Sequence, residues 1–114
     1  MKSGPETSRL QALSDWLGAG LGGDVRFDKT VKFDLRGEGF IFIDGVTITH
    51  EDRPADLTAT VSIDDLRAIG QGKLSTIGAV ASRRLGLSDM GVATSLLVPL
   101  RALFARSAQA AGSR

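Results

Sequence analysis

The sequence contains no cysteine and only one histidine among its 114 residues. Without cysteine there can be no disulfide framework, zinc–thiolate site or thiol nucleophile. A single histidine argues against a histidine-cluster metal site and against most histidine-based catalysis. Lysine and arginine together number 14 and the acidic residues 13, a formal net charge of +1. This balance argues against a dedicated nucleic-acid binder, which would carry a marked basic excess.

Long apolar runs are also missing. The longest one without a charge, at 90–100, falls far short of the roughly 20 residues that span a bilayer. The polar stretch 1–7 lacks the apolar centre of a signal peptide. We therefore expect a cytoplasmic protein. With 42% hydrophobic and 24% charged residues, the composition is that of one ordinary globular domain.

The first predicted element is an N-terminal helix. Leu10, Leu13, Trp16 and Leu17 recur at helical spacing and form one apolar face. The glycines that follow predict an end near Gly18. We interpret Trp16 as an anchor in the core or in a groove.

Strands follow the glycine-rich connection. Apolar and polar residues alternate along the chain, as in a half-buried strand. Residues 40–43 are apolar throughout, so both faces of that strand should be covered. Asp44-Gly45 is a strong hairpin signal. The predicted strands are 31–36, 40–43, 46–49 and 57–63.

The period then changes to that of helices. Ser62, Ser75 and the pair Ser88-Asp89 are each placed to cap a helix. A short fifth strand is expected at 85–87. The last helix carries one broad apolar stripe, and Pro99 should kink it or split it.

Catalytic and metal-binding motifs are absent or incomplete. There is no Gly-x-Ser-x-Gly turn, and His50 lies in a polar loop. Gly72-Lys73 resembles the end of a phosphate loop, but Leu74 replaces the hydroxyl residue that binds magnesium. Asp64-Asp65 fits helix capping better than paired acid–base chemistry. We therefore expect no enzyme, no cofactor and no metal site.

Several motifs occur together in a characteristic order. Pro-Ala-Asp-Leu-Thr-Ala-Thr-Val-Ser at 54–62 precedes Asp64-Asp65-Leu66, then Gly72-Lys73-Leu74, and finally Asp-Met-Gly-Val-Ala at 89–93. This set resembles the sterol carrier protein type 2 domain, also called the sterol-binding domain, over roughly 25–104. Two features depart from the family pattern: Ser88 replaces a common glycine, and Leu85 and Leu87 are one residue out of phase. A deletion or a bulge is therefore expected in that strand.

The resemblance implies an α+β fold in which helices cover one face of a five-stranded, mainly antiparallel sheet. It also implies an N-terminal helix and connection at 1–24, a lipid-binding domain at 25–106 and a flexible tail at 107–114. Family members hold sterols, fatty acids, acyl-CoA or other lipids in a tunnel between sheet and helices. The residues that we predict for the pocket wall are Phe33, Leu35, Leu66, Ile69, Ile77, Leu85, Met90 and Leu96.

The leading hypothesis is thus a non-catalytic carrier of an apolar ligand such as a sterol, fatty acid, acyl-CoA or isoprenoid lipid. The alternative is a protein-interaction or accessory scaffold without bound lipid, for example in quinone biosynthesis. Arg101, Arg106 and Arg114 leave open a transient contact between the last helix and a membrane surface. A homodimer is left open as well, and whether the sheet and helices enclose a cavity or a solid core is not decided by the sequence.

Overall fold

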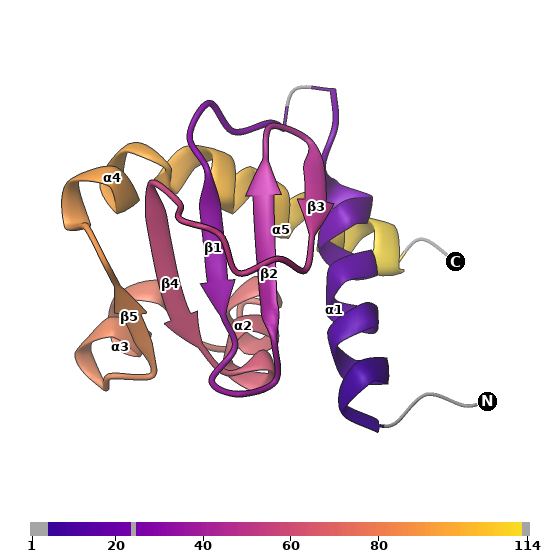
Figure 1. The fold of residues 1–114 in the computed structure, drawn as a ribbon, viewed down its shortest axis with the longest axis horizontal. Helices are drawn as coiled ribbons and strands as arrows, with labels where there is room; N and C mark the ends of the chain where they lie inside the picture. The colour runs from indigo at the N-terminus through magenta and orange to yellow at the C-terminus, as the bar shows by residue number, and fades with distance from the viewer. Residues whose placement is uncertain (1–4, 24, 113–114) are drawn as a thin grey trace.

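The computed structural model describes residues 5–23 and 25–112, and a mixed sheet forms its centre (Figure 1). The strands lie in the order β3-β2-β1-β4-β5. All neighbours pair antiparallel except β1 and β4, which are parallel. The expected five-stranded, mainly antiparallel sheet is therefore confirmed. Its strands are β1 (Val31–Asp34), β2 (Phe40–Asp44), β3 (Thr47–Thr49), β4 (Leu57–Val61) and β5 (Leu85–Leu87).

The inner face of the sheet is a continuous apolar surface, because the pairing brings alternate residues into rows. In one row Ile41 of β2 pairs with Phe33 of β1, which pairs with Ala59 of β4, which pairs with Leu87 of β5. The last strand pairs residue for residue with β4. The bulge expected in this strand is therefore not found between β4 and β5.

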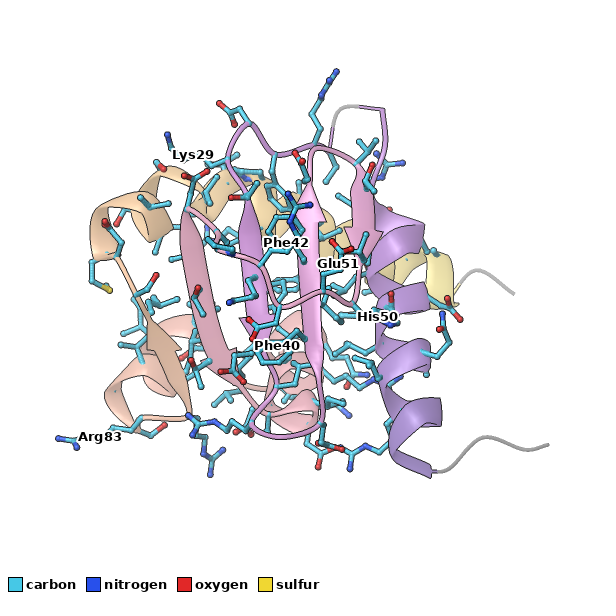
Figure 2. All side chains as sticks on the ribbon, in the orientation of Figure 1. Lys29, Phe40, Phe42, His50, Glu51 and Arg83 are labelled. Atoms are coloured by element: carbon cyan, nitrogen blue, oxygen red, sulfur yellow. The ribbon has the colours of Figure 1, made fainter. Side chains whose placement is uncertain are left out.

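The outer face is covered by the loop between β3 and β4, which crosses in front of the sheet (Figure 2). The Arg53 guanidinium lies 5.0 Å from the centre of the Phe42 ring, and Phe42 is only 3% exposed. Lys32 Nζ lies 5.5 Å from the centre of the Phe40 ring and 2.7 Å from Asp52 Oδ1. Such cation–π contacts contribute about 0.5–1 kcal/mol each. The prediction that the strand at 40–43, which is β2, is covered on both faces is confirmed.

Helices α2 and α5 lie behind the sheet, and α1 runs along its β3 side (Figure 1). Three predicted caps are confirmed. The hydroxyl of Ser62 accepts from the backbone N–H of Asp65 at 3.1 Å, that of Ser75 from Gly78 at 2.9 Å, and Asp89 Oδ1 from Val92 at 3.0 Å. The helices are α1 (Pro5–Gly20), α2 (Ile63–Gly70), α3 (Thr76–Ala81), α4 (Met90–Ser95) and α5 (Leu97–Gly112).

The final helix is split, as expected, but the break falls before Pro99. Leu96 ends α4 and its carbonyl accepts the first hydrogen bond of α5, from Leu100. Pro99 therefore stands in the first turn of α5, where a backbone N–H has no partner within the helix.

Helix α5 then continues to Gly112, through most of the segment expected to be a flexible tail. Ser107 in this segment is fully buried, which corrects that expectation for 107–112. Ser113 and Arg114 lie outside the described residues.

Helices α1 and α5 cross closely at Gly20. A Cβ atom there would lie 2.6 Å from the carbonyl oxygen of Leu103 and would also meet Ser107 Oγ. Neither neighbour can move away easily, since one is backbone and the other is a short buried side chain. The sequence predicted that α1 ends near Gly18, but it continues to Gly20 because packing on α5 stabilises the last turn.

This crossing yields a matched pair of substitutions. Gly20→Ala should lower the free energy of unfolding by about 1–3 kcal/mol, the usual effect of overpacking. Gly18→Ala lies in the same helix, and its Cβ would be 3.9 Å from the nearest atom, Ile48 Cδ1. It should be neutral or stabilising, by up to about 1 kcal/mol. Urea denaturation of both variants measures the difference, and equal stabilities would contradict the close crossing.

Candidate functional site

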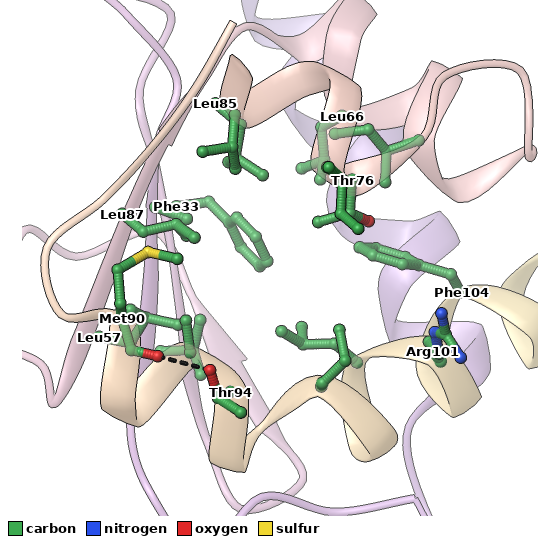
Figure 3. A pocket seen from close by; sticks show the side chains of 18 of the residues that line it. Phe33, Leu57, Leu66, Thr76, Leu85, Leu87, Met90, Thr94, Arg101 and Phe104 are labelled. Carbon is green, nitrogen blue, oxygen red and sulfur yellow. Dashed lines mark hydrogen bonds between the residues drawn. The ribbon is translucent and has the colours of Figure 1, made fainter. Parts of the chain in front are cut away.

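A cavity of about 410 Å³ lies between the inner face of the sheet and the helices (Figure 3). Its volume is within the range of about 300–1,000 Å³ that is usual for small-molecule sites. The sheet forms one wall with alternate inward-facing residues of three neighbouring strands. These residues are Val31, Phe33, Leu57, Ala59, Leu85 and Leu87.

Short helices form the opposite wall. Leu66 and Ile69 come from α2. Helices α3 and α4 contribute the small residues Ala81 and Ala93, and their larger lining side chains, Ile77 and Met90, are exposed. Because α3 and α4 are six residues each, they cover less of the sheet than a long helix would. Small side chains and short helices together leave the space unfilled.

The first turns of α5 complete the wall. Leu97, Leu100, Arg101 and Phe104 all line the cavity, and their spacing of three and four residues places them on one helical face. Phe104 stacks on Trp16 of α1, with ring centroids 6.2 Å apart and planes inclined by 18°. Trp16 itself fits closely against Gly70 at the end of α2, where an added Cβ would lie 3.0 Å from the ring atom Cζ3. Of the two places predicted for Trp16, the core or a groove, the structure favours the first, because Trp16 packs against the core and does not line the cavity.

The cavity reaches solvent at an apolar rim. Ile77 of α3 is 84% exposed and Met90 of α4 is 59% exposed, yet both line the cavity. Leu97 is also exposed and lines it, and Val98 beside it is 76% exposed. Large exposed apolar side chains around a concave opening are typical of a binding surface. We call these four residues the apolar rim.

The comparisons with solved structures bear on the fold. A sterol carrier protein 2 like 2 from Aedes aegypti matches with a TM-score of 0.58 and 18% identity, over 79% of this chain and 91% of that one. The sterol carrier protein domain 2 of Helicoverpa armigera matches with a TM-score of 0.59 and 20% identity, over 90% and 94% of the two chains. This chain has the sterol carrier protein fold.

The same fold extends to a conserved hypothetical protein of Thermus thermophilus, with a TM-score of 0.51 and 10% identity over 90% of this chain and 80% of that one. No protein-family model matches the chain, and no curated protein matches it in sequence. This chain and the three solved structures therefore share the sterol carrier fold. Their sequence identities are too low to assign the function of those proteins to this one.

Most of the predicted wall residues meet at the cavity. Leu35 and Leu96 do not line it; both are buried in the hydrophobic core. Leu35 follows the end of β1, beyond the part of the strand that faces the cavity, and Leu96 is the junction between α4 and α5. The predicted residues that do line it are Phe33, Leu66, Ile69, Ile77, Leu85 and Met90.

Sequence reasoning missed Phe104, Leu100 and Arg101 as wall residues. The helical stripe of the last helix contained Leu100 and Phe104, but a stripe that faces a core and one that faces a cavity have the same period. Arg101 was interpreted only as a basic residue of a surface helix. Arg101 lies four residues after Leu97 and therefore on the same face of the helix. This spacing was the signal that could have identified it as a wall residue.

Polar chemistry is sparse at this site. The cavity wall contains two hydroxyl residues, Thr76 and Thr94, and one charged residue, Arg101. Within 5–23 and 25–112, no group of three or more histidine, cysteine or acidic residues could hold a metal ion. His50 is exposed in the loop over the outer face, on the other side of the sheet.

Of the three arginines for which a membrane contact was left open, Arg106 donates to the carbonyl oxygen of Gly22 at 2.9 Å. Arg114 lies outside the described residues. Of the two arginines that the structure describes, only Arg101 lines the cavity. No helix in the described part of the chain is long and apolar enough to cross a bilayer.

The free energies of unfolding of two variants test whether Leu35 belongs to the core and Ile77 to the rim. Leu35→Ala should lower the free energy of unfolding by about 2–5 kcal/mol, because it removes fully buried atoms and leaves a void. Ile77→Ala should change it by less than about 0.5 kcal/mol, as at other exposed positions. Chemical denaturation gives both values. Similar losses in the two variants would contradict an exposed rim.

Proposed function

We propose that this protein binds and carries an apolar small molecule in the cavity and performs no catalysis. The ligand class is the one that the sequence indicated: a sterol, fatty acid, acyl-CoA or isoprenoid lipid. The observation that carries this proposal is an open cavity of about 410 Å³ with an almost wholly apolar wall. The sterol carrier names of two structures with the same fold also support it.

The driving force is desolvation of the ligand. Each methylene group that moves from water to an apolar site contributes about 0.8 kcal/mol. The rings of Phe33 and Phe104 and the leucine side chains of the wall provide the contacts. The affinity should therefore depend on hydrocarbon length and only weakly on chemical detail along the chain.

The apolar rim supports a proposal about loading. A lipid that leaves a bilayer must cross water unless the opening of the carrier touches the bilayer. Ile77 and Met90 line the cavity with exposed side chains, Val98 is exposed next to Leu97 in the sequence, and no residue after Asp89 is acidic. These features favour a transient contact with a membrane surface that contains anionic lipids.

The alternative function is a protein-interaction scaffold that docks a partner on the same exposed residues. A flat apolar patch would favour the scaffold function. Here the exposed residues surround a concave opening instead, which favours a small-molecule ligand.

Ligand uptake tests the carrier function directly. The neutral fluorescent probe N-phenyl-1-naphthylamine should bind, and saturated alkanols should displace it about fourfold more effectively for each added methylene, until the cavity is full. Val80→Trp should abolish or strongly reduce uptake, because Val80 lines the cavity. Val46→Trp, at an exposed position outside the wall, should bind like the wild type.

Native mass spectrometry of protein purified from cells gives an independent result and also reports the oligomeric state. Co-purified lipid supports the carrier function. A lipid-free protein that takes up no probe supports the scaffold instead.

Membrane contact has its own test. Val98→Ser should weaken co-flotation with vesicles of phosphatidylcholine and phosphatidylglycerol, because it removes an exposed apolar side chain of the rim. It should leave probe uptake unchanged, since Val98 does not line the cavity. Val46→Ser is the control, and equal flotation of the two variants would argue against contact through the rim.

A further inference from the structure

Arg101 is the only charged residue in the cavity wall, and nothing in the described part of the protein neutralises it. Within the described residues, its side chain makes neither an ion pair nor a hydrogen bond. Arg106 bonds the Gly22 carbonyl and Arg9 pairs with Glu38 and Asp64. The side chains of Arg26, Arg67 and Arg83 also lack a partner within the described residues, so what distinguishes Arg101 is its place in the cavity wall. An arginine without a partner at the edge of an apolar cavity has donors free for a ligand.

The position of Arg101 gives the cavity a polar and an apolar side. In Figure 3 Arg101 stands beside Phe104, across the cavity from Leu87, Met90 and Leu57. The labelled Thr76 lies nearer to Phe104 than to Met90 in this view, and its hydroxyl makes no hydrogen bond within the described part of the chain. The other hydroxyl, that of Thr94, already donates to the carbonyl oxygen of Met90 at 2.8 Å.

No acidic residue of the described part of the chain lines the cavity. The nearest acidic residue in sequence to the α4 part of the wall is Asp89, whose carboxylate accepts the backbone N–H of Val92 as a helix cap. An anionic group at the Arg101 side would therefore meet no negative charge in the wall. A cationic group there would face an unpaired guanidinium.

We propose that Arg101 makes the cavity selective for amphiphiles with an anionic head, and this inference rests on the proposed function. The head group lies at Arg101, with the hydroxyl of Thr76 as a second donor, and the hydrocarbon extends toward β5 and α4. The guanidinium fork matches the geometry of a carboxylate or a phosphate, the chemistry that these head groups share. A neutral sterol or alkanol would use only the apolar wall.

The test compares dodecanoic acid, dodecyl phosphate and 1-dodecanol, which share one hydrocarbon chain, as displacers of N-phenyl-1-naphthylamine. Arg101→Gln should weaken both anions about three- to tenfold, as expected for a charge-assisted contact at a partly exposed site. The affinity for 1-dodecanol should stay within about twofold. Arg101→Lys, which keeps the charge without the fork, should recover part of the loss. Added salt should weaken the anions only.

Arg26→Gln is the matched control. It removes the same charge from an exposed position outside the cavity wall, so all three affinities should equal those of the wild type. If only one anion loses affinity in Arg101→Gln, that result identifies the head group that Arg101 recognises.

Two results would overturn the proposal. Equal affinities of wild type and Arg101→Gln for both anions would remove Arg101 as the selective residue, while binding of the probe and of 1-dodecanol would leave the carrier function intact. If the wild type bound neither probe nor alkanol, the carrier function would fail and the selectivity with it. Melting curves followed by circular dichroism establish that each variant is folded.

Discussion

The close crossing of α1 and α5 at Gly20 is the constraint on which the rest of the architecture depends. It fixes the second half of α5 against α1, where Leu13, Leu17 and Leu103 are fully buried. The first half of the same helix then extends over the sheet with no long helix beside it. The position of one glycine thus determines where Leu97, Leu100 and Phe104 stand, and these side chains bound the cavity.

The empty space results from how unevenly the helices cover the sheet. Near β2 and β1, leucines of the long helices α1 and α5 fill the layer: Leu13, Leu17 and Leu103 belong to the buried core. Toward β4 and β5 the cover consists of α3 and α4, which are capped by Ser75 and Asp89 and whose largest lining side chains, Ile77 and Met90, are mostly exposed. Hydrogen-bonded caps let such short helices keep their shape without burying many side chains. Their stability therefore does not require the cavity to be filled.

Much of this fold could be predicted from the sequence, because local signals decide strands and caps. The alternation of Val31, Phe33 and Leu35 and the cap at Ser62 depend on a few neighbouring residues. The cavity could not be predicted in the same way. A leucine that faces a void and one that faces another leucine have the same pattern. Leu96, which was predicted for the wall, is therefore a core residue, and Leu100, which was not predicted for it, lines the cavity. The length of α5 was also missed, since a buried Ser107 depends on Gly20, a residue distant in the chain.

The two edges of the sheet, β3 and β5, are strands of only three residues each. A protein with exposed isoleucine, methionine and valine beside an open hollow is at risk of associating with its own copies. Long, flat outer strands would add a template of free backbone groups for that association. Edge strands this short offer few free backbone groups, which disfavours the joining of two sheets when two molecules meet through their exposed apolar rims.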